Sequence, residues 1–199
     1  MKLGTKSLLF GAHCFFLHPF FVAWAWWKLY GFPWDPRLWV AFIVHDWGYW
    51  GLEAMDDERG EMHPWVGARI MTLLFDSRHP VQDWRNKSLG AWGLFALRHS
   101  RFLAKRLGLP PSRLCMADKL AITLTPWWLY VPMTLATGEI HEYRRHGQGG
   151  KTDNTDHSQP SDSHKTWYQG LQAEMRAYVE MHKDGREDTW TPARETGAA

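Results

Sequence analysis

Apolar residues gather in long segments, and turns rich in glycine and proline separate these segments. Residues 5–30 are apolar nearly all round, which predicts one buried helix, or two joined at Pro19. Residues 37–45 predict a second buried helix, and residues 89–107 predict a third. The pattern indicates an all-α fold.

The C-terminal half continues the helical pattern and then loses it. Ser112 is a candidate N-cap for the helix that follows it, and residues 122–137 predict a core helix pair kinked at Pro126 and Pro132. Polar residues then dominate, which indicates a flexible linker, before apolar residues return at helical spacing. The predicted organisation is a helical domain at 1–145, a linker at 146–165, a helix at 166–184 that could dock on the core or hold a partner, and a tail at 185–199.

The N-terminal apolar segment must also be weighed as a membrane segment, because Lys2 and Lys6 precede it. His13, His18 and Pro19 interrupt the apolar residues, and no small-residue cleavage site follows. These features favour a buried helix, and membrane association stays open as the alternative.

The most informative polar residues are adjacent, His45 and Asp46, at the end of the second predicted helix. Gly48 and Gly51 follow and let the chain pack closely and turn. A buried, unpaired aspartate costs several kcal/mol, so such a pair needs a strong partner. A divalent metal ion accepts carboxylate oxygen and imidazole nitrogen together, and mixed ligands of this kind suit Zn, Fe, Mn or Co.

Residues 43–48, Ile-Val-His-Asp-Trp-Gly, resemble the signature of HD-domain proteins, the superfamily of metal-dependent phosphohydrolases. The resemblance implies that an earlier histidine and a later aspartate bind the same metal. His18, in a His-x-x-x-Val-Ala context, and Asp118, in Ala-Asp-Lys-Leu, match these positions, and His13 is a weaker candidate for the first. Tyr49 departs from the best-known members, which carry a lysine there.

Two further histidines resemble those of family members that bind a second metal ion. His63 begins His-Pro-x-x-Gly-Ala-x-Ile, and the proline places it near a helix N-cap. His99 has apolar residues three and four positions away, which places it on a buried helix face. The resemblance implies a second metal held by these two residues, with Asp46 as the bridging ligand. A capping histidine and a core histidine are the plainer interpretations.

The overall composition narrows the possible partners. The chain has 199 residues, 14 tryptophans, 11 histidines and a formal net charge of +2, which is too mild to indicate nucleic-acid binding. Its two cysteines, Cys14 and Cys115, support neither a disulfide framework nor a cysteine zinc site, so a reducing cytoplasm is the expected compartment. The tryptophan content indicates a homodimer interface as one option.

Basic residues near the predicted ligands indicate an anionic substrate. Arg98 and Arg101 lie beside His99, and Lys119 follows Asp118. Guanidinium groups bind phosphate oxygens in bidentate fashion. The expected substrate is a small phosphorylated molecule, a nucleotide or another, whose phosphoryl oxygens these cations contact.

The resemblance implies hydrolysis of a phosphate ester or anhydride by water activated by one or two divalent ions, which could be Mn, Fe, Co, Zn or Mg. Glu53 is the candidate general acid, because some superfamily members place a carboxylate soon after the His-Asp pair. Two alternatives stay open. One is a diiron oxygenase acting on a small polar or phosphonate substrate, since its ligand order is the same, and the other is a non-catalytic, metal-stabilised interaction module.

Overall fold

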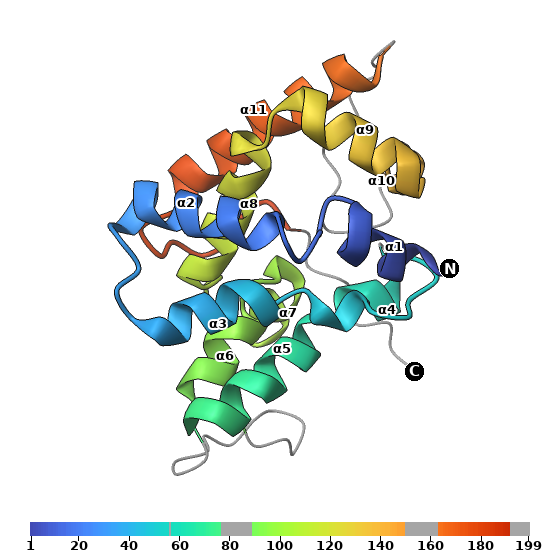
Figure 1. Cartoon of the computed structure of the whole chain (residues 1–199). Helices are drawn as coiled ribbons and strands as arrows, with labels where there is room; N and C mark the ends of the chain where they lie inside the picture. Colours follow the sequence, from blue (N-terminus) through green and yellow to red (C-terminus); the bar gives the residue numbers. More distant parts are fainter. Residues whose placement is uncertain (56, 77–88, 150–162, 192–199) are drawn as a thin grey trace, which may run out of the picture.

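The computed structural model describes residues 1–55, 57–76, 89–149 and 163–191, and its regular elements in these residues are helices (Figure 1). The prediction of an all-α fold is confirmed. The α-helices cover Leu3–Phe10 (α1), His18–Tyr30 (α2), Pro36–Val44 (α3), Glu58–Glu61 (α4), Pro64–Met71 (α5), Ala91–Leu97 (α6), Arg101–Arg106 (α7), Arg113–Leu124 (α8), Trp127–Thr137 (α9), Glu139–Gly149 (α10) and His164–His182 (α11), with a 3₁₀ turn at Trp47–Tyr49 (η1) and a π-helical turn at Thr72–Asp76 (η2).

The N-terminal apolar segment folds as two helices, α1 and α2. Residues 11–17 separate them, and Pro19 lies in the first turn of α2, where a missing backbone N–H costs nothing, and not at a joint between helices. Burial is one-sided, because Trp24 and Trp27 are exposed while Val22 is buried. Across the described residues, no helix combines the length and apolar content that crossing a bilayer requires.

The segment 89–107, expected to be one helix, contains a break between α6 and α7. Ser100 has extended backbone angles, and its Oγ accepts a hydrogen bond from the Leu103 N–H at 3.2 Å, so it is the N-cap of α7. His99 therefore lies in a turn between two helices and not on the face of a continuous one.

Three other boundaries differ from the expectation. Ser112 precedes α8 with the extended backbone of an N-cap, but its side chain makes no capping hydrogen bond. Helix α10 includes residues 146–149, which had been assigned to the linker, and residues 150–162 of that linker lie outside the described residues. Pro126 marks the boundary between α8 and α9, whereas Pro132 lies inside α9.

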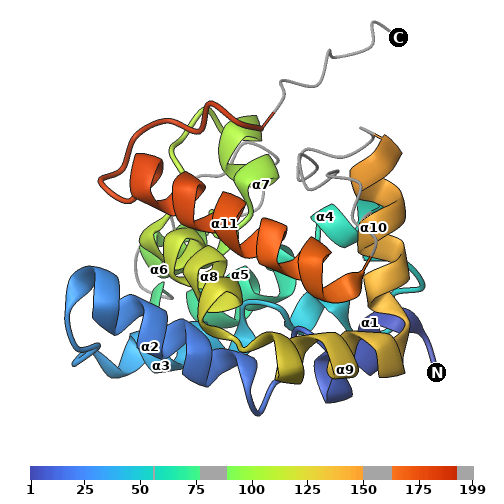
Figure 2. The same cartoon turned by 90° about the horizontal axis from the view of Figure 1, so that it is seen from above.

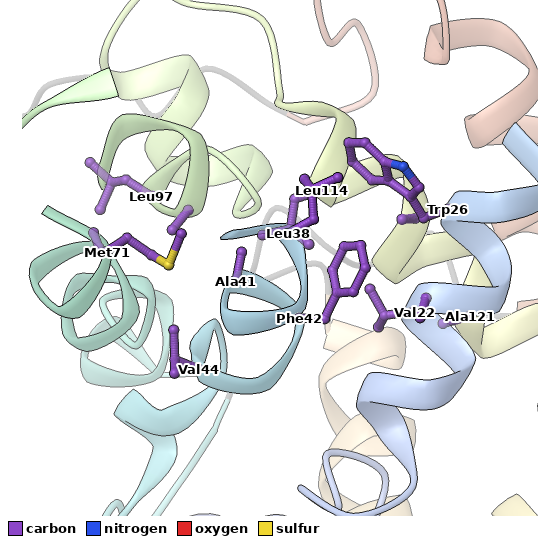
Figure 3. Packing of buried hydrophobic residues seen from close by; sticks show 14 of the residues in the cluster. Val22, Trp26, Leu38, Ala41, Phe42, Val44, Met71, Leu97, Leu114 and Ala121 are labelled. Carbon is purple, nitrogen blue, oxygen red and sulfur yellow. The ribbon is translucent and has the colours of Figure 1, made fainter. Parts of the chain in front are cut away.

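Helix α3 lies at the centre of the main hydrophobic core (Figure 3). Phe42 lies near Val22 of α2 and Ala121 of α8, and Val44 lies on the side of Met71 in α5. All of these side chains are buried. Removing such apolar surface from water stabilises the fold by about 25 cal/mol per Å². This packing fixes the relative positions of the helices that carry the polar residues described below.

The C-terminal helix α11 docks on the domain and lies across α8 and α9 (Figure 2). The Tyr168 ring stacks on Tyr130 at 4.0 Å, and its hydroxyl donates to the Ile122 carbonyl at 2.6 Å. Gln172 Nε2 donates to the Thr123 carbonyl at 3.1 Å. These bonds satisfy carbonyl groups that the last turn of α8 leaves without helical partners. Of the two roles that the sequence left open for this helix, the structure therefore has it docked on the core.

Glu139, the first residue of α10, links this helix to the loop after α1 by a hydrogen bond. The residue is fully buried, and its Oε1 accepts hydrogen bonds from the Ala12 N–H at 2.6 Å and from the Thr137 hydroxyl at 3.0 Å. Its Oε2 accepts from the Tyr143 hydroxyl at 3.3 Å. Burial raises the pKa of this carboxyl above its ordinary value in spite of these donors.

Glu139→Gln should raise the stability of the protein at neutral pH. A carboxyl whose pKa is raised by folding binds protons more tightly in the folded state, so its stabilising contribution is present at low pH and is lost as the pH rises. The amide keeps an oxygen acceptor without the charge. Thermal unfolding should therefore show a higher Tm than wild type at neutral pH, and the gain should shrink as the pH falls toward 4.5.

Glu139→Leu is the matched control, because it removes both the charge and the acceptors. We expect it to lower stability at every pH, by about 1–3 kcal/mol for each donor left unsatisfied. A Glu139→Gln protein that melts below wild type at neutral pH would show that the charged carboxylate is the more stable form.

Candidate metal centre

Six polar side chains from separate elements converge inside the helical domain. Their ligand atoms form two groups, within each of which every atom lies within 4.8 Å of the others, and one aspartate belongs to both groups. All but one of the six lie at a helix end or in a turn. They are the residues that the sequence nominated as metal ligands: His18, His45, Asp46, His63, His99 and Asp118.

Asp46 lies between the two groups. Its Oδ2 is 3.0 Å from His45 Nε2 and 3.4 Å from His18 Nε2. Its Oδ1 is 3.4 Å from both His63 Nε2 and His99 Nε2. Asp118 completes the first group, with Oδ1 3.0 Å from His18 Nε2. Asp46 thus presents each carboxylate oxygen to a different set of imidazoles, as a bridging ligand does.

The backbone orients three of the rings. The Nδ1 atoms of His45, His63 and His99 lie 3.0, 2.6 and 2.7 Å from the carbonyl oxygen three residues earlier in the chain. Because a carbonyl can only accept, Nδ1 of each ring carries a proton, and in the neutral form of the ring Nε2 directs a lone pair toward the centre. This hydrogen bond fixes the tautomer and the ring orientation of a metal-binding imidazole.

These tautomers leave converging lone pairs. His63 Nε2 and His99 Nε2 face each other at 3.0 Å, although both are acceptors. Within the described part of the chain, His45 Nε2 and Asp46 Oδ2 are buried without a hydrogen-bond partner. Acceptors that converge in this way repel one another and are costly to bury, so the arrangement calls for a cation.

The charges of the site favour the same conclusion. Burial raises the pKa of Asp46 and Asp118, but nearby histidines, and Lys119 in the case of Asp118, outweigh it and hold both values well below the ordinary range. Burial lowers the pKa of His45, and the two carboxylates outweigh this and raise it to about 10, so this ring would release a proton from Nε2 when it binds a metal ion. Burial lowers the pKa of His99 to about 4, which keeps this ring neutral, as a ligand must be.

The donor set fits a divalent metal ion. Two ligands that each lie about 2.1 Å from an ion are roughly 3.0–3.4 Å apart. The distances from Asp46 to its four imidazole neighbours fall in this range. Imidazole and carboxylate together suit first-row metals such as Zn, Fe, Mn and Co. The buried cluster could therefore hold a metal ion.

A cavity of about 40 Å³ adjoins the cluster, which is room for a few water-sized groups. Four of the six ligands contribute to its wall. The other residues around it are His13, Tyr49, Met55, Glu61, Ser100, Arg101, Phe102 and Lys119. The cavity therefore gives a small polar group access to the ligands.

Arg101 and Lys119, two of the predicted substrate contacts, bring positive charge to this cavity. Arg101 is buried, and its guanidinium lies over the Tyr178 ring at 4.7 Å. Lys119 Nζ lies 3.0 Å from Asp118 Oδ2. Burial lowers the pKa of Lys119, but Asp118 outweighs burial and raises it, so the ammonium group keeps its charge.

The structure does not bring Arg98 and Glu53 to the cavity. Arg98 Nε donates to the Pro110 carbonyl at 2.9 Å and so holds the turn that leads into α8. The helix break after Arg98 explains its position, because Arg98 and Arg101 no longer share one helix face. Glu53 is exposed, and its Oε1 lies 3.4 Å from Lys2 Nζ at the surface.

Glu61 and Tyr49 line the cavity, although the sequence gave neither a role there. Asp57 caps α4 by accepting a hydrogen bond from the Gly60 N–H at 2.7 Å, and the Gly60 carbonyl accepts from His63 Nδ1. This capped turn directs both Glu61 and His63 inward. The Tyr49 ring stacks on His63 at 3.9 Å, so the residue at the position where the best-known HD-domain proteins carry a lysine supports a candidate ligand.

Two glycines allow the loops around the cluster to approach closely. A Cβ on Gly48 would lie 1.9 Å from the His63 carbonyl oxygen, and one on Gly67 would lie 2.7 Å from the Val44 carbonyl oxygen. The close packing predicted at Gly48 is confirmed. The predicted turn at Gly51 is confirmed as well, since its φ of 81° favours glycine.

Comparison of the chain with protein-family models, with curated proteins and with solved structures gives no match. The resemblance to HD domains therefore rests on the residues and motifs of this sequence. The structure itself shows an all-helical protein with a buried histidine and aspartate cluster that could bind a metal.

A divalent ion should stabilise the protein, and Asp46→Ala should abolish this effect. An ion at 100 times its Kd adds about 2.7 kcal/mol, which for a chain of this size raises the Tm by roughly 5–10 °C. The measurement is thermal unfolding of chelator-treated protein with and without added Mn, Fe(II), Co or Zn. Glu53→Ala, which removes an exposed carboxylate, should keep the full shift. Equal shifts in Asp46→Ala and in wild type would place the ion elsewhere.

Proposed function

We propose that the protein is a metal-dependent hydrolase that cleaves a phosphate ester or anhydride of a small molecule. The observation that carries the proposal is the position of Asp46, whose two oxygens face two separate groups of imidazoles. Two divalent ions, when bound, supply an activated water and positive charge for phosphoryl oxygens. The HD-type order of the ligands along the sequence supports the same class of reaction.

Arg101 and Lys119 are proposed to bind the anionic part of the substrate. Both line the cavity beside the ligands, and both carry donors that suit phosphoryl oxygens. Lys119 also holds Asp118 Oδ2, which leaves Asp118 Oδ1 directed at His18. Lys119 thus has two roles in the proposal, to orient a ligand and to offset charge on the substrate.

Glu61 is proposed as the group that gives a proton to the leaving oxygen, in place of Glu53. It is buried in the cavity wall, whereas Glu53 is exposed to solvent away from the ligands. A carboxyl group positioned in a cavity next to the reacting bond is a typical general acid.

A diiron oxygenase is the second candidate, and the observation that favours it is the number of imidazoles. Four of the six candidate ligands are histidines, and imidazole is a good ligand for iron. The residues do not distinguish the two reactions, because both use the same donors in the same order. The identity of the bound metal separates them.

The first test is the metal content of protein purified under anaerobic conditions without added metal. We expect two divalent ions per chain in wild type, and one in His63→Ala and in His99→Ala, because the other group of ligands stays intact. His141→Ala, which removes an exposed histidine on α10, is the matched control and should keep both ions.

Release of phosphate from nucleotides and other phosphoesters should depend on the second ion. His63→Ala and His99→Ala should lower kcat/KM by on the order of 10²–10³. Glu61→Gln should lower kcat by on the order of 10² or more with unchanged metal content. Two irons with oxygen consumption and no phosphate release would favour the oxygenase. Folded protein that binds no metal would contradict both reactions.

A further inference from the structure

The outer side of α2 and the turn that follows it expose several aromatic side chains. Phe20, Trp24 and Trp27 lie at positions i, i+4 and i+7 and so share one side of the helix. They are 69%, 45% and 57% exposed, and Trp34 in the next turn is 84% exposed. Single exposed apolar residues are ordinary in proteins, but a contiguous group of large ones marks a binding surface.

Helix α9 extends this surface. Figure 2 shows α2 and α9 along the same edge of the molecule. A small pocket lies between them, and its lining includes Leu17 and Phe21 from the α2 segment and Leu129 and Met133 from α9. Trp128, in the first turn of α9, is 62% exposed. We call the exposed rings of α2, of the turn after it and of the first turn of α9 the aromatic face: Phe20, Trp24, Trp27, Trp34 and Trp128.

The charges near the aromatic face are basic. Lys28 Nζ lies 5.4 Å from the centre of the Trp24 ring, and Lys165 Nζ lies 4.5 Å from the centre of the Trp127 ring. Neither residues 1–34 nor residues 119–138 contain an aspartate or a glutamate. Asp35, which follows Trp34, is already paired with Arg37 at 2.7 Å. The surface thus combines exposed indole rings with the ammonium groups of Lys28 and Lys165.

We propose that the aromatic face docks on the surface of a phospholipid bilayer that contains anionic lipids. Indole rings suit the boundary between acyl chains and headgroups, because they are apolar and carry one N–H donor. Lysine side chains can cover apolar surface while their ammonium groups stay at headgroup level, where they attract anionic lipids.

A second copy of the chain fits this surface less well than a bilayer does. Self-association through the aromatic face would move Lys28 and Lys165 toward an interface whose nearest acid in the sequence, Asp35, already pairs with Arg37. Burying a charged group without a partner is costly. On a bilayer the same two lysines keep water and gain phosphate groups. This docking involves one side of the domain and is independent of the reaction at the metal centre.

The experiment is flotation of the full-length chain with vesicles of phosphatidylcholine alone and with added phosphatidylglycerol. We expect the chain to float with the anionic vesicles and to bind neutral ones more weakly. Replacing both Phe20 and Trp27 by glutamine should lower the partition coefficient by about tenfold or more. The two side chains are each only partly exposed, so the double substitution removes roughly one aromatic side chain from contact with lipid. Lys28→Glu should weaken binding to the anionic vesicles and leave binding to neutral vesicles nearly unchanged.

Leu73→Gln is the matched control, because Leu73 is 74% exposed and lies on η2, away from the aromatic face. It should bind like wild type, and all variants should melt near the wild-type Tm. Three results would overturn the proposal: no flotation with either vesicle, equal loss in Leu73→Gln, or light scattering that shows a dimer dissociated by the Phe20 and Trp27 substitutions without any vesicle binding.

Discussion

The structure depends most on one electrostatic constraint, the convergence of imidazole nitrogens and carboxylate oxygens around Asp46. Neutral imidazoles and ionised carboxylates that point at one another in a buried site repel, so the packing of the surrounding helices must offset this repulsion. A cation placed between these nitrogen and oxygen atoms would attract each of them, so the net interaction within the cluster would become favourable. The raised pKa of His45 shows that even a proton is attracted strongly to this position. A metal ion would turn the same contacts into the strongest bonds of the core.

Most of these candidate ligands lie at the ends of helices, and the helix ends orient them. The carbonyls that accept from the three Nδ1 atoms belong to Phe42, Gly60 and Ala96, each in the last turn of its helix. Carbonyls in the last turn lack the ordinary helical N–H partner four residues on, although those of Gly60 and Ala96 also accept from the backbone N–H groups of His63 and His99 at 3.0 and 3.2 Å. Each histidine therefore satisfies a helix C-terminus with one ring nitrogen and directs the other at the centre. The same hydrogen bond thus pairs a carbonyl at the end of a helix and orients the ring of a candidate ligand.

The sequence predicted the helical fold and the six converging residues because both follow from short motifs and from apolar spacing. It missed the break before Ser100, since Arg98 to Arg101 continues the helical pattern and only the capping hydrogen bond reveals the new start. It also preferred Glu53 to Glu61. Both belong to an acidic stretch, and which acid turns inward depends on the α4 turn and on the close approach of Gly60 to the Met55 carbonyl. That approach depends on the backbone conformation of the loop, which the spacing of residue types does not report.

Helix α2 shows why an apolar pattern can be interpreted in two ways. A helix that is apolar all round is expected either in a protein core or in contact with lipid. In α2 the side that carries Val22 meets the core, and its first residue, His18, reaches the candidate metal centre, whereas Trp24 and Trp27 face outward. The alternatives of burial and membrane contact therefore do not exclude each other. If the outer side meets a bilayer, each side of this one helix is apolar for a separate reason, which explains why the sequence shows no polar face.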